Sequence, residues 1–277
     1  MKRIGIIGAN GFIGRHLYKE LLADGHTVYG ASFPQFDVRF SPWPFAEPID
    51  ILIIASHLGS VDDCKVKQTE TYAVNVTGVI RILEEATKRN VVPVYLSSNM
   101  VFAGERADYR EDEAVSPLTE YGKQKAEVEA YIQQHFSNFI ITRLTKIYSG
   151  QLDEPSLVSD WVTAWRNNKS VLAIDDMVIS PVLIDDLIKI FNQLIDSDFT
   201  GVLHIGGPEQ LSVFDLALAC VRQIKGDESL VIRKKRADFR FAETRPPYQT
   251  LNTDTLQSLI IWPLTSLPAV FARLNRE

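Results

Sequence analysis

Three glycines spaced three residues apart, in the segment GANGFIG at residues 8–14, constrain this chain more than any other feature. They follow an apolar run, RIGIIG, and precede an amphipathic segment, GRHLYKELLADG. This order predicts a strand, a turn and a helix. Gly8 would permit the sharp turn, Gly11 would let the backbone approach a pyrophosphate, and Gly14 would let the helix pack against the sheet. The helix N-terminus would face the phosphates; a tight turn without a ligand is the alternative.

The first 150 residues repeat this alternation. Apolar runs predict four further strands, in HTVYGAS, DILIIAS, VVPVYLSS and NFIITRL. Amphipathic patterns predict helices at residues 71–90 and 116–136, the second with Ser116 as N-cap and Pro117 at its first position. The Pro-rich segment 33–48 is expected to be a loop. The pattern predicts an α/β fold, a doubly wound parallel sheet of the Rossmann type.

After about residue 150 the alternation weakens. Helices are predicted in EPSLVSDWVTAWRNN, PVLIDDLIKIFNQLID and SVFDLALACVRQI, the last starting near Ser212, whereas RKKRADFRF and ETRPPYQTLNT are expected to be mostly irregular. We therefore expect a nucleotide-binding domain at residues 1–150 and a smaller substrate-binding region at 151–277. The short strand GVLHIGG, near 201–207, is compatible with a return to the main sheet.

Composition excludes several classes of function. With 277 residues, 45% of them hydrophobic, the chain can bury a sizeable core. Its net charge of −6 argues against a general nucleic-acid or anionic-membrane binder, although a small anionic ligand needs only a local positive site. Cys64, Cys220 and the five histidines show no metal-ligand spacing. No run reaches membrane length without charge. We expect a cytoplasmic protein without a metal.

The segment YGKQK places Tyr121 and Lys125 four residues apart, on one face of a helix. A nearby ammonium favours phenolate and would lower the pKa of the tyrosine. Ser97 and Ser98 end a predicted strand, at the sheet edge where doubly wound proteins bind ligands. A hydroxyl there can bind a substrate carbonyl or alcohol. An ordinary pair on a solvated helix face is the alternative for Tyr121 and Lys125.

Taken together, the glycines, Asn75, Ser98 and the Tyr121-x-x-x-Lys125 pattern resemble the extended short-chain dehydrogenase/reductase family. Within it, the segments SSNMVFAG, YGKQKAEVE, SPVLIDDL and RPPYQTLNTDTL are similar to dTDP-4-dehydrorhamnose reductase and related nucleotide-sugar reductases. The resemblance covers almost the whole chain.

This resemblance implies a role for each matching residue. Tyr121 would be the general acid/base, Lys125 would lower its pKa and bind the nicotinamide ribose, and Ser98 would hold the substrate oxygen. Asn75 matches the family's helix asparagine near the active site. The residues assigned to the cofactor are Gly8, Gly11, Phe12, Ile13, Gly14, Arg15, Ser32, Ala55, Asn75 and Lys125.

The end of the second strand favours NADP over NAD. A carboxylate usually binds the ribose 2′-hydroxyl there, but this chain has Ser32 at that place. Arg15, just past Gly14, would supply positive charge to a 2′-phosphate; a solvated helix residue is the alternative. Asp37 is a weaker candidate for a position near the adenine.

The substrate side departs from the resembling reductases. These usually show Thr-Asp-Tyr where this chain has Ser98, Asn99 and Met100, and often Trp where it has Lys146. Arg245 matches a family arginine and is a candidate diphosphate ligand, and the basic run at residues 232–240 is another. The residues assigned to the substrate are Ser98, Asn99, Met100, Lys146 and Arg245.

The sequence therefore predicts an NAD(P)-dependent reductase of a carbonyl on a nucleotide-linked sugar. A nucleotide-sugar epimerase with the same three residues and a non-catalytic nucleotide-binding regulatory subunit remain open. The expected partners are the small-molecule substrate and a second copy in a homodimer, with no nucleic acid and no membrane. His57 is expected to face the cleft in a supporting role, and the pair Asp175–Asp176 to form a turn rather than a cation site.

Overall fold

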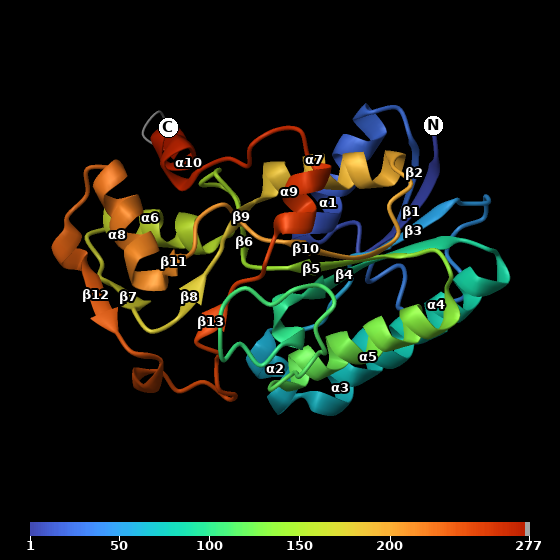
Figure 1. Ribbon diagram of the computed structural model, residues 1–277, viewed down its shortest axis with the longest axis horizontal. Helices are drawn as coiled ribbons and strands as arrows, with labels where there is room; N and C mark the ends of the chain where they lie inside the picture. The colour runs from blue at the N-terminus through green and yellow to red at the C-terminus, as the bar shows by residue number, and fades with distance from the viewer. Residues whose placement is uncertain (275–277) are drawn as a thin grey trace.

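A six-stranded parallel sheet forms the centre of the protein, whose computed structural model describes residues 1–274 (Figure 1). Its strands are β1 (Arg3–Ile7), β2 (Thr27–Ala31), β3 (Ile51–Ile54), β4 (Val92–Ser98), β5 (Ile140–Leu144) and β10 (Gly201–Ile205). They lie in the order β10-β5-β4-β3-β1-β2, and all neighbours are parallel. The predicted doubly wound fold is confirmed. Strand β2 lies on one side of β1, and β3 and the later strands lie on its other side. Doubly wound folds bind ligands at this change in strand order, between β1 and β3.

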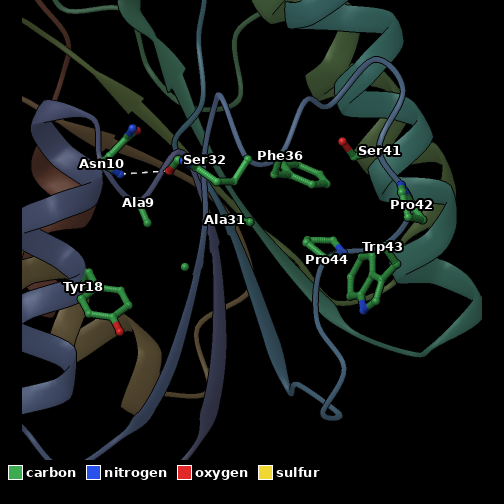
Figure 2. A pocket seen from close by; sticks show the side chains of 12 residues that line it. Ala9, Asn10, Tyr18, Ala31, Ser32, Phe36, Ser41, Pro42, Trp43 and Pro44 are labelled. Carbon is green, nitrogen blue, oxygen red and sulfur yellow. Dashed lines mark hydrogen bonds between the residues drawn. The ribbon is translucent and has the colours of Figure 1, made fainter.

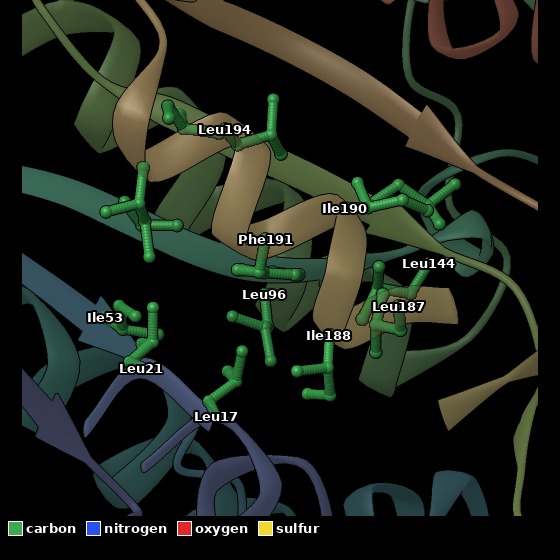
Figure 3. Close-up of a cluster of buried hydrophobic side chains, with 14 of the residues drawn as sticks. Leu17, Leu21, Ile53, Leu96, Leu144, Leu187, Ile188, Ile190, Phe191 and Leu194 are labelled. Carbon is green, nitrogen blue, oxygen red and sulfur yellow. The ribbon is translucent and has the colours of Figure 1, made fainter. Parts of the chain in front are cut away.

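Helices cover both faces of this sheet because its strands are apolar on both sides. On one face α1 (Phe12–Ala23) packs against α7 (Ile184–Asp196) and alternate strand residues such as Ile53 (Figure 3). On the other face α4 (Val79–Lys88) and α5 (Glu120–His135) cover residues such as Leu52. The sheet is therefore the buried middle layer of three, and its C-terminal edge is left for function.

The segment predicted as one helix at 71–90 is divided. It contains the end of α3 (Gln68–Tyr72), a π-helical turn η1 (Ala73–Gly78) and α4. Single π-turns of this kind occur frequently at functional sites.

The predicted N-cap of α5 was wrong. Thr119 caps the helix, since its hydroxyl accepts a hydrogen bond from the Gly122 N–H at 3.1 Å. Ser116 is occupied elsewhere: its N–H donates to the Val101 carbonyl at 2.8 Å and its hydroxyl accepts from the Ala103 N–H at 3.3 Å. These contacts across the chain keep residue 116 outside the helix.

The smaller region has its own apolar core, which includes Trp161, Trp165 and Phe271. Its helix α8 starts after Ser212, as predicted. Strand β12 (Val231–Lys234), which pairs with β7, includes Arg233 and Lys234, the first two residues of the segment RKKRADFRF that was expected to be mostly irregular. The remaining elements are α2 (Val61–Val66), η2 (Asn99–Val101), β6 (Ile147–Tyr148), α6 (Leu157–Arg166), β7 (Val171–Ile174), β8 (Val178–Ile179), β9 (Val182–Leu183), β11 (Leu211–Ser212), α8 (Val213–Gln223), η3 (Glu228–Leu230), η4 (Arg236–Asp238), β13 (Tyr248–Gln249), α9 (Asp254–Leu259) and α10 (Leu267–Leu274).

The chain crosses between the two regions more than once. Strand β10 adds to the edge of the main sheet beside β5, and α7 packs against α1. The division at residue 150 stays a prediction. Along residues 1–274, none of the helices combines the length and apolarity needed to cross a membrane.

Candidate functional site

Ser98, Tyr121 and Lys125 meet at the C-terminal end of β4. Ser98 is the last residue of that strand, and Tyr121 lies in the first turn of α5. Lys125, one turn later, donates from Nζ to the Leu96 carbonyl at 2.8 Å, and its Nζ lies 5.9 Å from the centre of the Tyr121 ring. The helix and the strand thus bring the three sequence-predicted residues together.

Burial controls the electrostatics of this group. It raises the pKa of the half-buried Tyr121, and a hydrogen bond with Ser98 works in the opposite direction. Burial also lowers the pKa of the Lys125 ammonium to about 8. The expected lowering of the Tyr121 pKa by Lys125 is not found in this structure, where burial raises that pKa and Ser98, rather than Lys125, opposes the rise. Tyr121 is a protonated phenol near neutral pH.

A cavity of about 630 Å³ opens beside Tyr121 and Ser98. Asn99, Met100, Lys146 and Arg245, which the sequence assigned to the substrate, line it, and it is called the substrate cavity below after this assignment. The opposite wall comes from the smaller region and is largely apolar. Its aromatic side chains are Trp161, Phe239 and Phe241, of which the two phenylalanines stack with ring centres 5.4 Å apart.

Two cations mark the polar side of this cavity. Arg245 pairs with Asp62 at 3.0 Å and lies over the Phe241 ring at 4.6 Å. Burial lowers the pKa of the Lys146 ammonium. The Asp160 charge partly offsets this effect, and the Arg245 charge adds to it. Apolar and aromatic walls with two cations fit a ligand that has both a flat base and an anionic part.

A second cavity, of about 440 Å³, lies at the ends of β1, β2 and β3. Gly8, Gly11, Ser32 and Ala55, which the sequence assigned to the cofactor, line it, and it is called the cofactor cavity below after this assignment. Phe12, Ile13 and Gly14, which the sequence also assigned to the cofactor, form the start of α1 and are not among the residues that line this cavity.

The glycine turn leaves no room for side chains. Gly8 has φ +87°, and a Cβ there would lie 2.7 Å from the Ser56 nitrogen. A Cβ at Gly14 would lie 2.1 Å from the Gly8 carbonyl oxygen. Gly11 begins α1 without a side-chain cap, so the first N–H groups of the helix are free for a ligand. This cradle fits the pyrophosphate of a dinucleotide.

Arg15 is not brought to Ser32. Its guanidinium pairs with Glu154 at 3.0 Å, and the same carboxylate contacts His16 at 2.7 Å. Arg39 lines the cofactor cavity together with Ser32 instead, and is paired with Asp37 at 2.6 Å. Sequence reasoning identified Asp37 but missed Arg39, although the segment QFDVRF contains both.

A third cavity, of about 730 Å³, lies beside the Pro-rich loop at residues 33–48 (Figure 2). It shares Asn10, Ser32 and Phe36 with the cofactor cavity, and Tyr18 and Trp43 stand on its opposite sides. The Asn10 N–H donates to the Ser32 hydroxyl at 3.0 Å, which joins the glycine turn to the end of β2. No charged side chain is among the residues that line this cavity.

Asn75 lines neither the cofactor cavity nor the substrate cavity. From the π-turn η1 its amide oxygen accepts from the Leu58 N–H at 2.8 Å, and its nitrogen donates to the Leu58 carbonyl at 3.1 Å and to Gln124 at 2.9 Å. The asparagine therefore fixes the segment after β3 against helix α5, rather than contacting a ligand directly.

His57 is the residue that the cofactor and substrate cavities share among those described. Its ring packs edge-on against Tyr121, with centres 4.9 Å apart, and lies 3.9 Å from the Cys64 sulfur. Burial, and after it the Lys125 charge, lowers the pKa of His57 to about 3. The imidazole is thus neutral at the junction of the two cavities.

The basic run is largely neutralised by its neighbours. Arg233 and Lys235 pair with Asp175, and Arg236 pairs with Asp176. Up to residue 274, the structure contains no group of three His, Cys, Asp or Glu side chains that could hold a metal. The two aspartates are ion-pair partners in this structure.

Comparison with known proteins finds relatives that match most of the length of this chain. A dTDP-4-dehydrorhamnose reductase of Aggregatibacter actinomycetemcomitans is 26% identical over 93% of this chain and 92% of its own length. The methionine adenosyltransferase 2 subunit beta of Bos taurus is 24% identical over 79% of this chain and 71% of its own.

Among solved structures, the dTDP-4-dehydrorhamnose reductase of Bacillus anthracis in complex with NADP has a TM-score of 0.88 and 21% identity. The match covers 98% of both chains. The model of the RmlD substrate binding domain matches residues 1–274. The chain therefore belongs to the RmlD substrate binding domain family, together with the dTDP-4-dehydrorhamnose reductases.

Proposed function

We propose that this protein is an NAD(P)-dependent reductase that acts on a carbonyl of a nucleotide-linked sugar. One observation carries the proposal. Tyr121 and Ser98 line the substrate cavity at the point where His57 joins it to the cofactor cavity. A carbonyl in the first cavity and a nicotinamide in the second would meet beside a phenol that is able to donate a proton.

The cofactor would be held by the glycine turn and the end of β2, and would supply the hydride. NADP is favoured over NAD, because Ser32 leaves room for a 2′-phosphate where a carboxylate would repel it. Arg39, which lines the same cavity, is the cation that would pair with this phosphate in place of Arg15.

The protein's own groups would manage the proton. Ser98 would hold the substrate oxygen by a hydrogen bond, and Tyr121 would donate its proton to that oxygen as negative charge develops there. The Lys125 ammonium would stabilise the phenolate that results. With the pKa of Lys125 at about 8, turnover is expected to decline on the basic side near that pH.

The substrate cavity supports a nucleotide-linked ligand. Arg245 and Lys146 would bind the diphosphate, and Trp161 or Phe241 would stack on the base. We further propose that residues 151–277 supply most of the apolar wall of the substrate cavity, while residues 1–150 supply the proton donor and the cofactor cavity.

A panel of nucleotide-linked 4-ketosugars tests the proposal. The purified protein should consume NADPH in equimolar amount with one of them. Turnover without net consumption would indicate an epimerase. Tight NADPH binding without turnover of any sugar would favour a regulatory protein, the alternative that the similarity to the bovine subunit beta supports.

A further inference from the structure

A buried cluster of charged and polar side chains lies directly behind Tyr121 and Lys125. Its centre is the ion pair between Glu129 of α5 and Arg143 of β5. The Glu129 Oε2 and the Arg143 Nη2 lie 2.8 Å apart, and the two side chains are 2% and 4% exposed, respectively. The Arg143 Nε lies within 3.2 Å of both carboxylate oxygens. The Ser97 hydroxyl of β4 donates to the same carboxylate. Two neighbouring strands therefore hold Glu129.

Arg143 extends the cluster away from the catalytic helix. Its Nη1 donates to the Glu111 carbonyl at 3.3 Å and lies 3.2 Å from Nε2 of His204. Burial and the Arg143 charge lower the pKa of His204 to about 3, so its imidazole is neutral. The guanidinium also lies over the Phe102 ring at 4.9 Å. Apart from Glu129, the partners of Arg143 in this cluster are neutral groups.

Glu129 and Lys125 are one turn apart on the same face of α5. They contact consecutive residues of β4: Lys125 donates to the Leu96 carbonyl, and Glu129 accepts from the Ser97 hydroxyl. These two contacts, one helical turn apart, hold this face of α5 against β4, in addition to the contacts that Gln124 makes on the side of η1. The next residue of the strand is Ser98, so both contacts fix α5 relative to the substrate-binding hydroxyl.

The titratable groups that face Lys125 come from several elements. They are Tyr121 and Glu129 of α5, Tyr95 of β4, Cys64 of α2 and His57 after β3. Burial raises the pKa of both tyrosines and of the Cys64 thiol and lowers that of His57, so these four are uncharged near neutral pH. Among these described groups Glu129 is the carboxylate, and it is ion-paired with Arg143.

We propose that Glu129 is a positioning residue for the proton donor: held by Arg143 and Ser97, its carboxylate holds α5 against β4 and keeps Lys125 charged. Burial lowers the pKa of the Lys125 ammonium, and Cys64 and then the Glu129 carboxylate oppose this effect. The consequence for turnover rests on the proposed function, whereas the effect on Lys125 itself does not.

Substituting Glu129 alone is a poor test, because Glu129→Gln leaves the buried Arg143 charge without a partner and can unfold the protein. The double variant Glu129→Gln/Arg143→Met removes both charges and keeps similar volumes. If the ion pair has no effect on Lys125, the folded double variant should show the Lys125 pKa of the parent protein. If Glu129 keeps Lys125 charged, the fold should be retained while Lys125 is altered.

The pKa of Lys125 can be followed by NMR in protein labelled with ¹³C at lysine Cε, with Lys125→Arg to assign the signal. We expect a lower Lys125 pKa in the double variant than in the parent. Where a substrate is known, the basic limb of kcat should move to lower pH. A matched control, Glu85→Gln/Arg89→Met, removes an exposed ion pair of α4 and should leave Lys125 unchanged.

An unchanged Lys125 pKa in a folded double variant would overturn the proposal. So would a double variant that does not fold, since the pair would then be required for folding as such. A lowered Lys125 pKa in a protein that turns over no sugar would instead uphold this inference and count against the proposed function.

Discussion

At the scale of single residues, the choice of cofactor depends on the few side chains around Ser32. The sequence identified the absent carboxylate at this position, because it lies at a fixed place after β2. It did not identify the cation. Arg15 is near in sequence but is paired with Glu154, which is far away along the chain, whereas Arg39 reaches the cavity through the course of a Pro-rich loop. Loop geometry of this kind has no periodic pattern in the sequence.

Arg39→Ala should weaken NADPH binding about tenfold and leave NADH binding nearly unchanged, since one charge-assisted hydrogen bond to the 2′-phosphate is lost. Titration of each cofactor by fluorescence gives both affinities. Arg15→Ala is the matched control and should alter neither. Ser32→Asp should shift the preference toward NADH. Equal effects of Arg39→Ala on both cofactors would remove the basis for assigning Arg39 to the phosphate.

Substrate choice also depends on single residues. Asn99, Met100 and Lys146, the positions at which the sequence departs from the pattern expected of a rhamnose-forming reductase, all line the substrate cavity. We expect dTDP-4-dehydrorhamnose to be a poor substrate, with kcat/KM below about 10⁴ M⁻¹s⁻¹, the low end of ordinary enzymes. Steady-state kinetics of NADPH consumption measure it. Efficient turnover of this compound would show that the three replacements do not affect specificity.

At the scale of elements, the strands were predictable and the breaks in the helices were not. Runs such as ILII at β3 are apolar at every position, as is typical of strands that are buried on both faces of a parallel sheet. The π-turn contains Asn75, whose side chain is hydrogen-bonded to Leu58, seventeen residues earlier in the chain. Helix α5 is capped by Thr119 rather than Ser116 because Ser116 is hydrogen-bonded to Val101 and Ala103. Helical periodicity does not encode such partners.

Asn75→Ala should remove the two hydrogen bonds that hold Leu58. Leaving these backbone groups unpaired should lower the free energy of unfolding by about 1–3 kcal/mol. Because residues 55–58 line the cofactor cavity, NADPH binding should weaken as well. Urea unfolding and cofactor titration measure the two effects. Thr77→Ala, an exposed position in the same π-turn, is the control; equal behaviour of the two variants would contradict the role given to Asn75.

At the scale of the whole molecule, the site depends on contacts between its two regions. The segment with Phe241 and Arg245 reaches α2 through the Arg245–Asp62 ion pair, and Glu243 accepts from the Glu120 N–H at the start of α5 at 2.9 Å. The sequence assigned Arg245 to the substrate only through a family resemblance. It did not indicate Trp161 or Phe241, because an aromatic residue in a cavity wall and one in a core look alike in a sequence.

Buried neutral histidines should make the fold sensitive to acid. His57 and His204 have pKa values of about 3 in the folded protein, against an ordinary value of 6.5. The unfolded chain therefore binds more protons between these values, so stability is full above pH 6.5 and falls as the pH drops toward 3. The loss should be at most about 1.4 kcal/mol per pH unit for each histidine.

Urea unfolding at several pH values between about 7 and 5 measures this loss, in a range above the titration of ordinary carboxylates. His204→Gln keeps an acceptor for Arg143 and should reduce the slope by about half, as one of two contributing groups is removed. A free energy of unfolding that does not change with pH in this range would contradict the neutral state of the two histidines.

The central claim is that Tyr121 donates the proton, and the rate of NADPH consumption by Tyr121→Phe tests it most directly. The substitution removes one hydroxyl, so folding and cofactor affinity should match the parent protein. Turnover of the sugar that the parent reduces should fall about 10²- to 10⁴-fold, the usual contribution of a positioned acid. A Tyr121→Phe protein that binds NADPH normally and retains most of its turnover would show that the tyrosine is not the proton donor.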